Sequence, residues 1–267
     1  MQTIAFFGSH PLGESCLERL LDHPDVEVDP VVTYPRGYDS WWDGSVHDLT
    51  VENDLTVYTL DEERNVLDHD VDYLLSVYYP NILGAELLDH PKELPLNLHQ
   101  AELPRYRGSN VFSHSIMNAR QDDHWKHGTT LHVMAEEVDQ GDVIERRFVD
   151  IEEEDTARSV YEKTREESIR LFEDLLPKIV SGEIGERRTP QSAFDGERYF
   201  YTKESLDGLK EIDRAELVDP NEEAVLYDRI RALDFPPFEP AYVELDGHRI
   251  YLTKNSYEDI ENLGVTL

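Results

Sequence analysis

The chain has 267 residues, enough for one substantial domain and a smaller one, and it carries 58 acidic against 25 basic residues, a formal net charge of −33. This balance argues against nucleic acid as a partner, and because the acids are spread evenly it favours adaptation to concentrated salt over recruitment of basic partners. A single cysteine, no signal peptide and no long apolar run argue against disulfides and a membrane partner, and favour a cytoplasmic location.

The first 180 residues alternate between strand and helix patterns. The predicted strands span residues 3–7, 26–32, 55–60, 71–78, 94–99 and 128–134, and the predicted helices span residues 12–21, 84–88, 109–118 and 155–182. Strands that alternate with helices are typical of an open, mostly parallel sheet covered on both faces. The sequence therefore predicts a Rossmann-like α/β fold.

Two segments of this predicted domain could contact an anionic or aromatic ligand. Gly8 and Ser9 form the turn before the first helix, where backbone N–H groups can approach an anion, although a simple tight turn is an equal alternative. They match neither G-x-G-x-x-G nor the P-loop pattern. The loop over residues 34–42 is rich in aromatic residues and includes Arg36 and Trp41, which could stack on a base or sugar or cap the core.

The composition changes at residues 185–195, which we interpret as a linker between a domain at 1–185 and a C-terminal α+β module at 197–267. In this module Pro220 opens a predicted helix, and Asp246-Gly247 marks a β-hairpin. The apolar residues of the hairpin could form a homodimer surface or pack within the module: Tyr242, Ile250 and Tyr251.

The residues with the clearest chemistry are Asn97 and His99, which share one face at the end of a predicted strand. An amide and an imidazole side by side supply an oxyanion donor and a proton carrier. Asp139, in a later loop, supplies a candidate carboxylate partner. On its own, N-x-H is a weak motif that occurs by chance in many chains.

Three motifs taken together are more specific than N-x-H alone. The chain contains N-L-H-x-A-x-L-P-x-Y-R-G-x-N over residues 97–110, G-T-T-L-H over residues 128–132 and D-Q-G-D-V-I over residues 139–144. In order and separation these motifs resemble those of the 10-formyltetrahydrofolate-dependent formyltransferases, and most closely the nucleotide-linked amino-sugar N-formyltransferases. The resemblance covers roughly residues 1–180 and implies the formyltransferase fold.

The resemblance implies a role for several positions. It assigns catalysis to Asn97, His99 and Asp139, with 10-formyltetrahydrofolate as co-substrate and no metal. The implied folate contacts are Tyr78, Tyr79, Pro80, Asn81, Ile82, Leu83 and Gly141. The candidate contacts of the second substrate are Gly8, Ser9, Arg36, Trp41, Arg107 and Asn110, and Arg107 could equally pair with an acidic side chain. His132, on a strand of alternating character, is expected to be a structural or substrate-orienting histidine rather than a general base.

The implied reaction is formyl transfer to the primary amine of a dTDP- or UDP-linked amino sugar. Two alternatives within the family are methionyl-tRNA and glycinamide ribonucleotide formyltransferases, and the charge balance argues against the first. An alternative from a different class is a catalytically silent folate- or nucleotide-binding protein on the same scaffold.

Overall fold

The computed structural model describes residues 1–219 and 222–257, and these residues form two compact units. Unit 1 comprises Met1–Arg105, Thr129–Arg147 and Arg165–Glu197, and unit 2 comprises the remainder. Pro220, predicted to open a helix, and residues 258–267 of the predicted C-terminal module lie outside the described residues.

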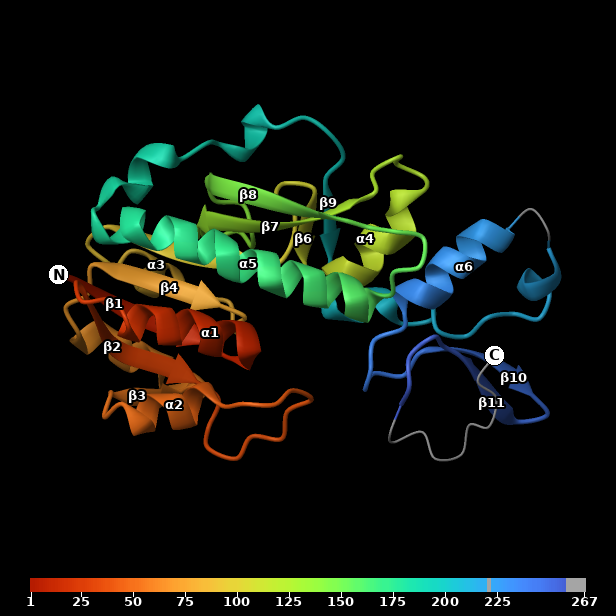
Figure 1. Ribbon diagram of the computed structural model, residues 1–267, viewed down its shortest axis with the longest axis horizontal. Helices are drawn as coiled ribbons and strands as arrows, with labels where there is room; N and C mark the ends of the chain where they lie inside the picture. The colour runs from red at the N-terminus through yellow and green to blue at the C-terminus, as the bar shows by residue number, and fades with distance from the viewer. Residues whose placement is uncertain (220–221, 258–267) are drawn as a thin grey trace. The chain divides into compact units, whose positions relative to one another are not determined.

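A seven-stranded sheet organises the first part of the chain (Figure 1). In spatial order its strands are β3 (Val57–Thr59), β2 (Val26–Thr33), β1 (Gln2–Gly8), β4 (Tyr73–Val77), β5 (Leu94–His99), β7 (Lys126–Val133) and β8 (Val143–Asp150). The first five strands run parallel to one another, and β7 runs antiparallel to β5. The predicted mostly parallel sheet is confirmed.

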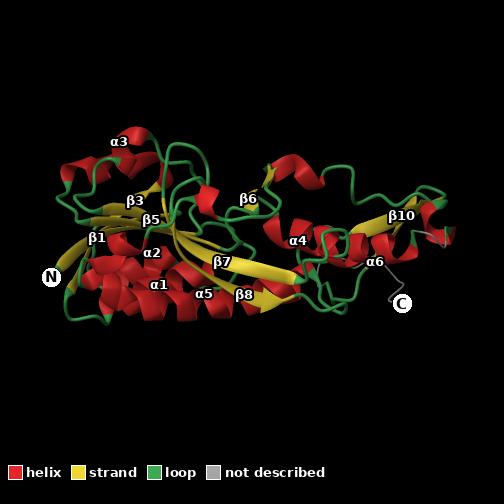
Figure 2. Cartoon of the chain, turned by 90° about the horizontal axis from the view of Figure 1, so that it is seen from above, coloured by secondary structure: helices red, strands yellow, loops and turns green. Residues whose placement is uncertain are grey.

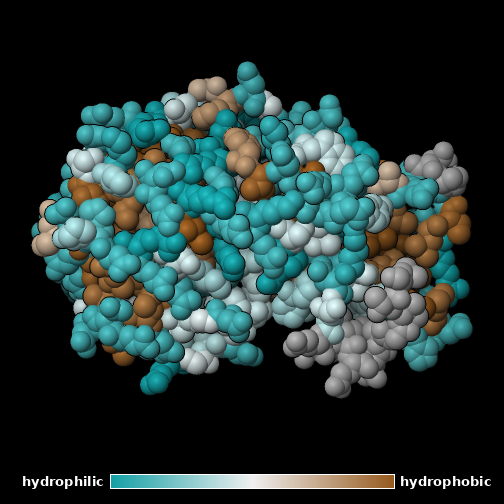
Figure 3. Space-filling model, viewed as in Figure 1, coloured by the Kyte–Doolittle hydropathy of each residue, from teal (hydrophilic) through white to brown (hydrophobic). Residues whose placement is uncertain are grey.

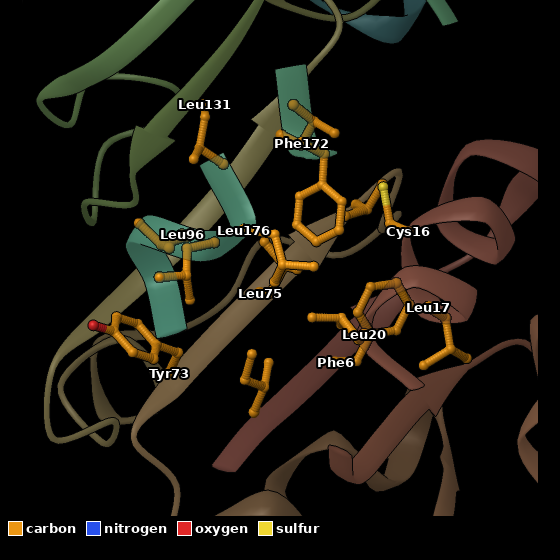
Figure 4. Packing of buried hydrophobic residues seen from close by; sticks show 14 of the residues in the cluster. Phe6, Cys16, Leu17, Leu20, Tyr73, Leu75, Leu96, Leu131, Phe172 and Leu176 are labelled. Atoms are coloured by element: carbon orange, nitrogen blue, oxygen red, sulfur yellow. The ribbon is translucent and has the colours of Figure 1, made fainter. Parts of the chain in front are cut away.

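Alternate residues of the central strands face two separate hydrophobic clusters, so the sheet is covered on both faces, as predicted. One cluster joins the strands to α1 (His10–Leu21) and to the long helix α5 (Ala157–Val180). Figure 4 shows Phe6 beside Leu20 of α1, and Leu75 and Leu96 near Phe172 and Leu176 of α5. The second cluster joins the opposite face to the 3₁₀ segment η1 (Leu60–Asp68) and α3 (Ala85–Leu88).

Strand β8 and helix α2 (Val46–Glu52) are among the elements that were not predicted. Strand β8 begins with the apolar pair Val143-Ile144 but continues through Glu145-Arg146-Arg147, which breaks the alternation expected of a strand. Helix α2 contains β-branched residues that disfavour helices, and the hydroxyl of Ser45 caps it by accepting a hydrogen bond from the Asp48 backbone N–H at 3.2 Å. Neighbouring structure and a cap thus outweigh local propensity.

Unit 2 holds two small sheets beside helices (Figure 2). Its elements include β6 (Tyr106–Gly108), α4 (Val111–Ala119), β9 (Tyr199–Tyr201), α6 (Glu223–Ala232), β10 (Ala241–Leu245) and β11 (His248–Leu252). Strands β6 and β9 pair in parallel, and β10 and β11 form the predicted hairpin around Asp246-Gly247, both with positive φ. Within the described residues, no helix has the length and apolar character needed to cross a membrane.

Candidate active site

Strand β5 ends with two of the predicted catalytic residues, and its antiparallel neighbour β7 adds a third polar side chain. In the β5–β7 register Asn97 is opposite His132, and His99 is opposite Thr130. Both strands belong to the interior of the sheet, so their backbones are fixed by hydrogen bonds on each side. The amide and the imidazoles are therefore held on rigid elements.

The carboxylate of Asp139 lies between the two histidines. His99 Nε2 is 3.8 Å from Asp139 Oδ2, and His132 Nε2 is 3.7 Å from Oδ1. The side chains of His99 and Asp139 are only 12% and 11% exposed, which weakens screening by solvent between them. The structure thus brings together Asn97, His99 and Asp139, which are separated by up to 42 positions in the sequence.

His132 has a defined tautomer. Its Nδ1–H donates to the Val133 carbonyl oxygen at 2.9 Å, so Nε2 is left to accept a hydrogen bond from Asn97 Nδ2 at 3.0 Å. Burial lowers the pKa of His132 to about 4, although the Asp139 carboxylate acts in the opposite direction. A neutral His132 therefore orients the Asn97 amide, with one N–H directed at the ring and a second left for another acceptor.

We expect the His132 ring to stay neutral, with its proton on Nδ1, down to about pH 5, because its pKa in the folded chain is about 4. The unfolded chain has the ordinary value near 6.5, so the stability contributed by the neutral ring is present above that pH and is lost as the pH falls toward 4. Two-bond ¹H–¹⁵N spectra of histidine-labelled protein, assigned with a His132→Gln variant, measure the tautomer. Titration of this ring near pH 6.5 would contradict the assignment.

The loop that carries Asp139 is tightly constrained. Asp139 adopts a left-handed φ of 54°, and a Cβ on Gly141 would collide with the Val133 carbonyl oxygen. The Val133 backbone N–H donates to the Asp142 carbonyl at 2.9 Å. The Gln191 side-chain amide donates to the carbonyl oxygens of Asp139 and Gly141 at 2.7 and 2.8 Å. Glycine is thus required at position 141 by the close backbone approach.

A cavity of about 340 Å³ lies beside the chain segment 133–136, which links His132 to the Asp139 loop. Its walls combine apolar side chains with carboxylates, among them Leu88, Val133, Met134, Asp89, Glu93 and Glu136. This volume is within the range of small-molecule sites. Apolar walls that also present carboxylate acceptors suit a flat heteroaromatic ring with N–H donors.

The predicted folate residues Tyr78–Leu83 follow the end of β4, and neither they nor Gly141 line this cavity. Tyr78 stacks on His10 with ring centroids 3.9 Å apart. The Tyr79 hydroxyl and the Asn81 amide both donate to the Glu63 carboxylate, at 2.6 and 3.0 Å, and Ile82 is exposed. Helix α3, immediately after this segment, supplies the cavity wall instead.

A second cavity, of about 120 Å³, lies where β1 and β2 end. Its lining includes Ser9, His10, Tyr34, Tyr38, Trp42 and Asp48. Trp41 is not among the lining residues, but its ring centroid is 5.3 Å from that of His10, which is. The Arg36 side chain is 83% exposed and 3.8 Å from the Asp48 carboxylate. Gly8 is needed for close packing, because a Cβ there would collide with the Phe6 ring.

Arg107 and Asn110 lie in unit 2. The Asn110 amide donates to the carbonyl oxygens of Thr202 and Lys203 at 3.2 and 2.9 Å and to Ser205 Oγ at 3.2 Å. These contacts give Asn110 a structural role in its own unit. Arg107 lies on β6 with its Nε buried.

The arrangement around Asn97 is suited to acyl transfer, because it supplies an oriented N–H donor, an imidazole and a carboxylate to one point. Sequence reasoning did not identify Gln191 or His10 as residues of these sites, since neither belongs to a recognisable motif.

Within residues 1–219 and 222–257, no group of three His, Cys, Asp or Glu side chains is arranged to hold a metal ion.

Comparison with known sequences identifies a family model described as formyl transferase, which matches residues 53–176. The bifunctional polymyxin resistance protein ArnA of Wigglesworthia glossinidia brevipalpis is 31% identical over 199 residues, 73% of this chain and 28% of that protein. GDP-perosamine N-formyltransferase of Brucella melitensis is 30% identical over 184 residues, 68% of this chain and 64% of that protein. The chain thus spans less than two thirds of these relatives.

A methionyl-tRNA formyltransferase of Lactobacillus gasseri is 28% identical over 264 residues, which cover 95% of this chain and 79% of that protein. Among solved structures, a 4-N formyltransferase from Francisella tularensis superposes with a TM-score of 0.74 at 21% identity, covering 94% of this chain and 96% of that one. The N-formyltransferase from Helicobacter canadensis, solved with folinic acid and dTDP-3-aminofucose, gives 0.72 at 19%, covering 94% and 86%. These structures share the fold.

Proposed function

The chain belongs to the formyl transferase family, and from this we propose that it transfers the formyl group of 10-formyltetrahydrofolate to the primary amine of a nucleotide-linked amino sugar. The observation that carries the proposal is the meeting of Asn97, His99 and Asp139 within the partly buried site at the end of β5. Sugar N-formyltransferases with the same fold, and the related GDP-perosamine enzyme, support the substrate class.

Asn97, His99 and Asp139 each have a separate role in the proposed reaction. The amine nitrogen attacks the formyl carbon, and the carbonyl oxygen becomes an oxyanion that Asn97 Nδ2 and the His99 imidazole stabilise. Asp139 accepts the proton that the amine loses, directly or through a water. When the bond from carbon to the folate nitrogen breaks, His99 protonates that nitrogen. Proton transfer and charge stabilisation thus occur within one site.

The larger cavity fits the formyl donor. A pterin ring is flat, so its faces match the apolar walls formed by Leu88, Val133 and Met134. It also carries several N–H donors, for which the carboxylates of Asp89 and Glu136 are acceptors. The segment 133–136 lines this cavity and continues into the Asp139 loop. A ring bound in the cavity would therefore contact a segment that ends three residues before the catalytic carboxylate.

We place the nucleotide at the aromatic cavity at the ends of β1 and β2. Ligands of open α/β sheets bind at the carboxyl ends of the strands, and strand order reverses between β1 and β4. Tyr34, Tyr38 and Trp42 offer rings for stacking on a base, and Ser9 precedes the first helix, whose N-terminus favours a phosphate. Arg36, whose guanidinium is 3.8 Å from the Asp48 carboxylate at this cavity, is the cation available to a phosphate of the nucleotide.

A methionyl-tRNA substrate is the second candidate, because the Lactobacillus gasseri enzyme aligns over 95% of this chain. A net charge of −33 opposes it, since binding of tRNA phosphates requires a basic surface. Figure 3 shows one face of the protein, and hydrophilic side chains cover most of it.

Incubation of the purified protein with 10-formyltetrahydrofolate and a panel of dTDP-, UDP- and GDP-linked amino sugars tests the proposal. Mass spectrometry is expected to show one amino sugar gaining a formyl group while tetrahydrofolate is released in equal amount. Thermal stabilisation by dTDP, UDP or GDP alone identifies the base. Formylation of methionyl-tRNA or glycinamide ribonucleotide, with no reaction of any sugar, overturns the substrate class, and folate binding without transfer to any amine supports a silent binding protein.

A further inference from the structure

The backbone that carries Asp139 is held by a segment 50 residues further along the chain. Thr189 exchanges two backbone hydrogen bonds with Val143, at 2.9 and 2.8 Å, and Gln191 follows in the short 3₁₀ segment η3 (Gln191–Ala193). These residues all belong to unit 1. The segment therefore runs along the start of β8 and reaches the Asp139 loop just before that strand.

We propose that Gln191 is a positioning residue for the catalytic carboxylate, a role that rests on the proposed function of Asp139. Its Nε2 donates one hydrogen to the Asp139 carbonyl oxygen and the other to that of Gly141, at 2.7 and 2.8 Å. The two bonds restrain the backbone from the carbonyl of Asp139, the residue with the left-handed φ, to the carbonyl of Gly141. The carboxylate is thereby kept between the two imidazoles.

The chemistry of this position favours glutamine. Both acceptors are carbonyl oxygens, and only a side chain with two N–H donors on one atom can satisfy the pair in this geometry. The donor must also be neutral, because a cation beside Asp139 would pair with its carboxylate and compete with His99. Gln191 is 9% exposed, so water has little access to replace it.

The test combines catalysis with a measurement that needs no catalysis. In Gln191→Ala we expect kcat to fall by about 10²-fold, since displacement of a reacting group by about 1 Å has that effect, while KM for the formyl donor is unchanged. Hydrogen exchange of the amides at residues 139–143 is expected to accelerate. Ser192→Ala is the matched control, because Ser192 is the exposed neighbour in the same segment.

Gln191→Glu separates the hydrogen bonds from the volume of the side chain. Ionised glutamate has no donor, so near pH 8 its kcat is expected to match that of Gln191→Ala. Burial beside two carbonyl oxygens raises the pKa of a carboxyl group above its ordinary value, so kcat of Gln191→Glu is expected to rise above that of Gln191→Ala as the pH falls and protonation restores one donor. Unchanged exchange of residues 139–143 in Gln191→Ala, or unchanged kcat, overturns the proposal. If the unsubstituted protein transfers no formyl group, the proposed function fails, and the exchange data still decide whether Gln191 restrains the loop.

Discussion

Replacing Asn97 with alanine is expected to lower kcat by about 10²–10³-fold, the usual effect of losing one oxyanion donor. One hydrogen of Asn97 Nδ2 is directed at His132 Nε2, so the second is the one that meets the developing charge. Since this interaction strengthens only as the carbonyl oxygen becomes an anion, kcat and kcat/KM are expected to fall together. Steady-state kinetics with the formyl donor and the amino sugar measure the effect.

Asn97→Asp is the sharper variant, because it keeps the shape of the side chain and replaces the donor with a negative acceptor. The new carboxylate would face the unprotonated His132 Nε2, which is also an acceptor, and would repel the developing oxyanion. Activity is therefore expected to fall at least as far as in Asn97→Ala. Asn53→Ala is the control, because Asn53 is exposed and its side-chain amide donates to the carbonyl oxygen of Leu49 in the adjoining helix α2. If Asn97→Ala retains more than about a tenth of the kcat, Asn97 has no part in the oxyanion site.

Periodicity predicted the strands that carry the site because their alternation reflects burial between two layers. On β4, alternate positions face the cluster with α1 and α5 or the opposite one. On β5, the alternate leucines face the first cluster, and the sequence shows the same period. Asn97 and His99 share a face for the same reason. The strand β8 was not predicted, because its central charged residues interrupt the period.

Contacts between distant segments could not be predicted from local pattern. The contact of His132 with Asn97 depends on the antiparallel register of β5 and β7, and no local signal fixes that register. Gln191 is 52 positions from Asp139 and belongs to a stretch whose composition indicates only a linker. Its role depends on a tertiary approach of two loops, which sequence periodicity does not encode.

The acidic surface has a structural consequence, because the few cations are shared among several carboxylates. Arg147 lies within 4 Å of Glu145, Glu167 and Asp174. Lys163 contacts both Glu152 and Asp155, which belong to a run of four consecutive acids. Charge pairing within the chain therefore leaves a large excess of negative charge, from which we expect the folded state to depend on mobile ions that screen it.

We accordingly expect the midpoint of thermal unfolding to rise by about 10 °C or more between about 0.05 and 2 M KCl, because the Debye length falls from more than 10 Å to about 3 Å by about 1 M. Most of the rise in the midpoint is expected below about 1 M KCl, where the Debye length changes fastest with salt concentration. Differential scanning calorimetry measures it, and sucrose, which strengthens burial without screening charge, is expected to reproduce little of it. The double variant Glu52→Gln, Asp54→Asn removes two exposed carboxylates and is expected to lower the KCl concentration required. A midpoint independent of KCl, or one that sucrose raises equally, would show that charge repulsion does not limit the stability of this fold.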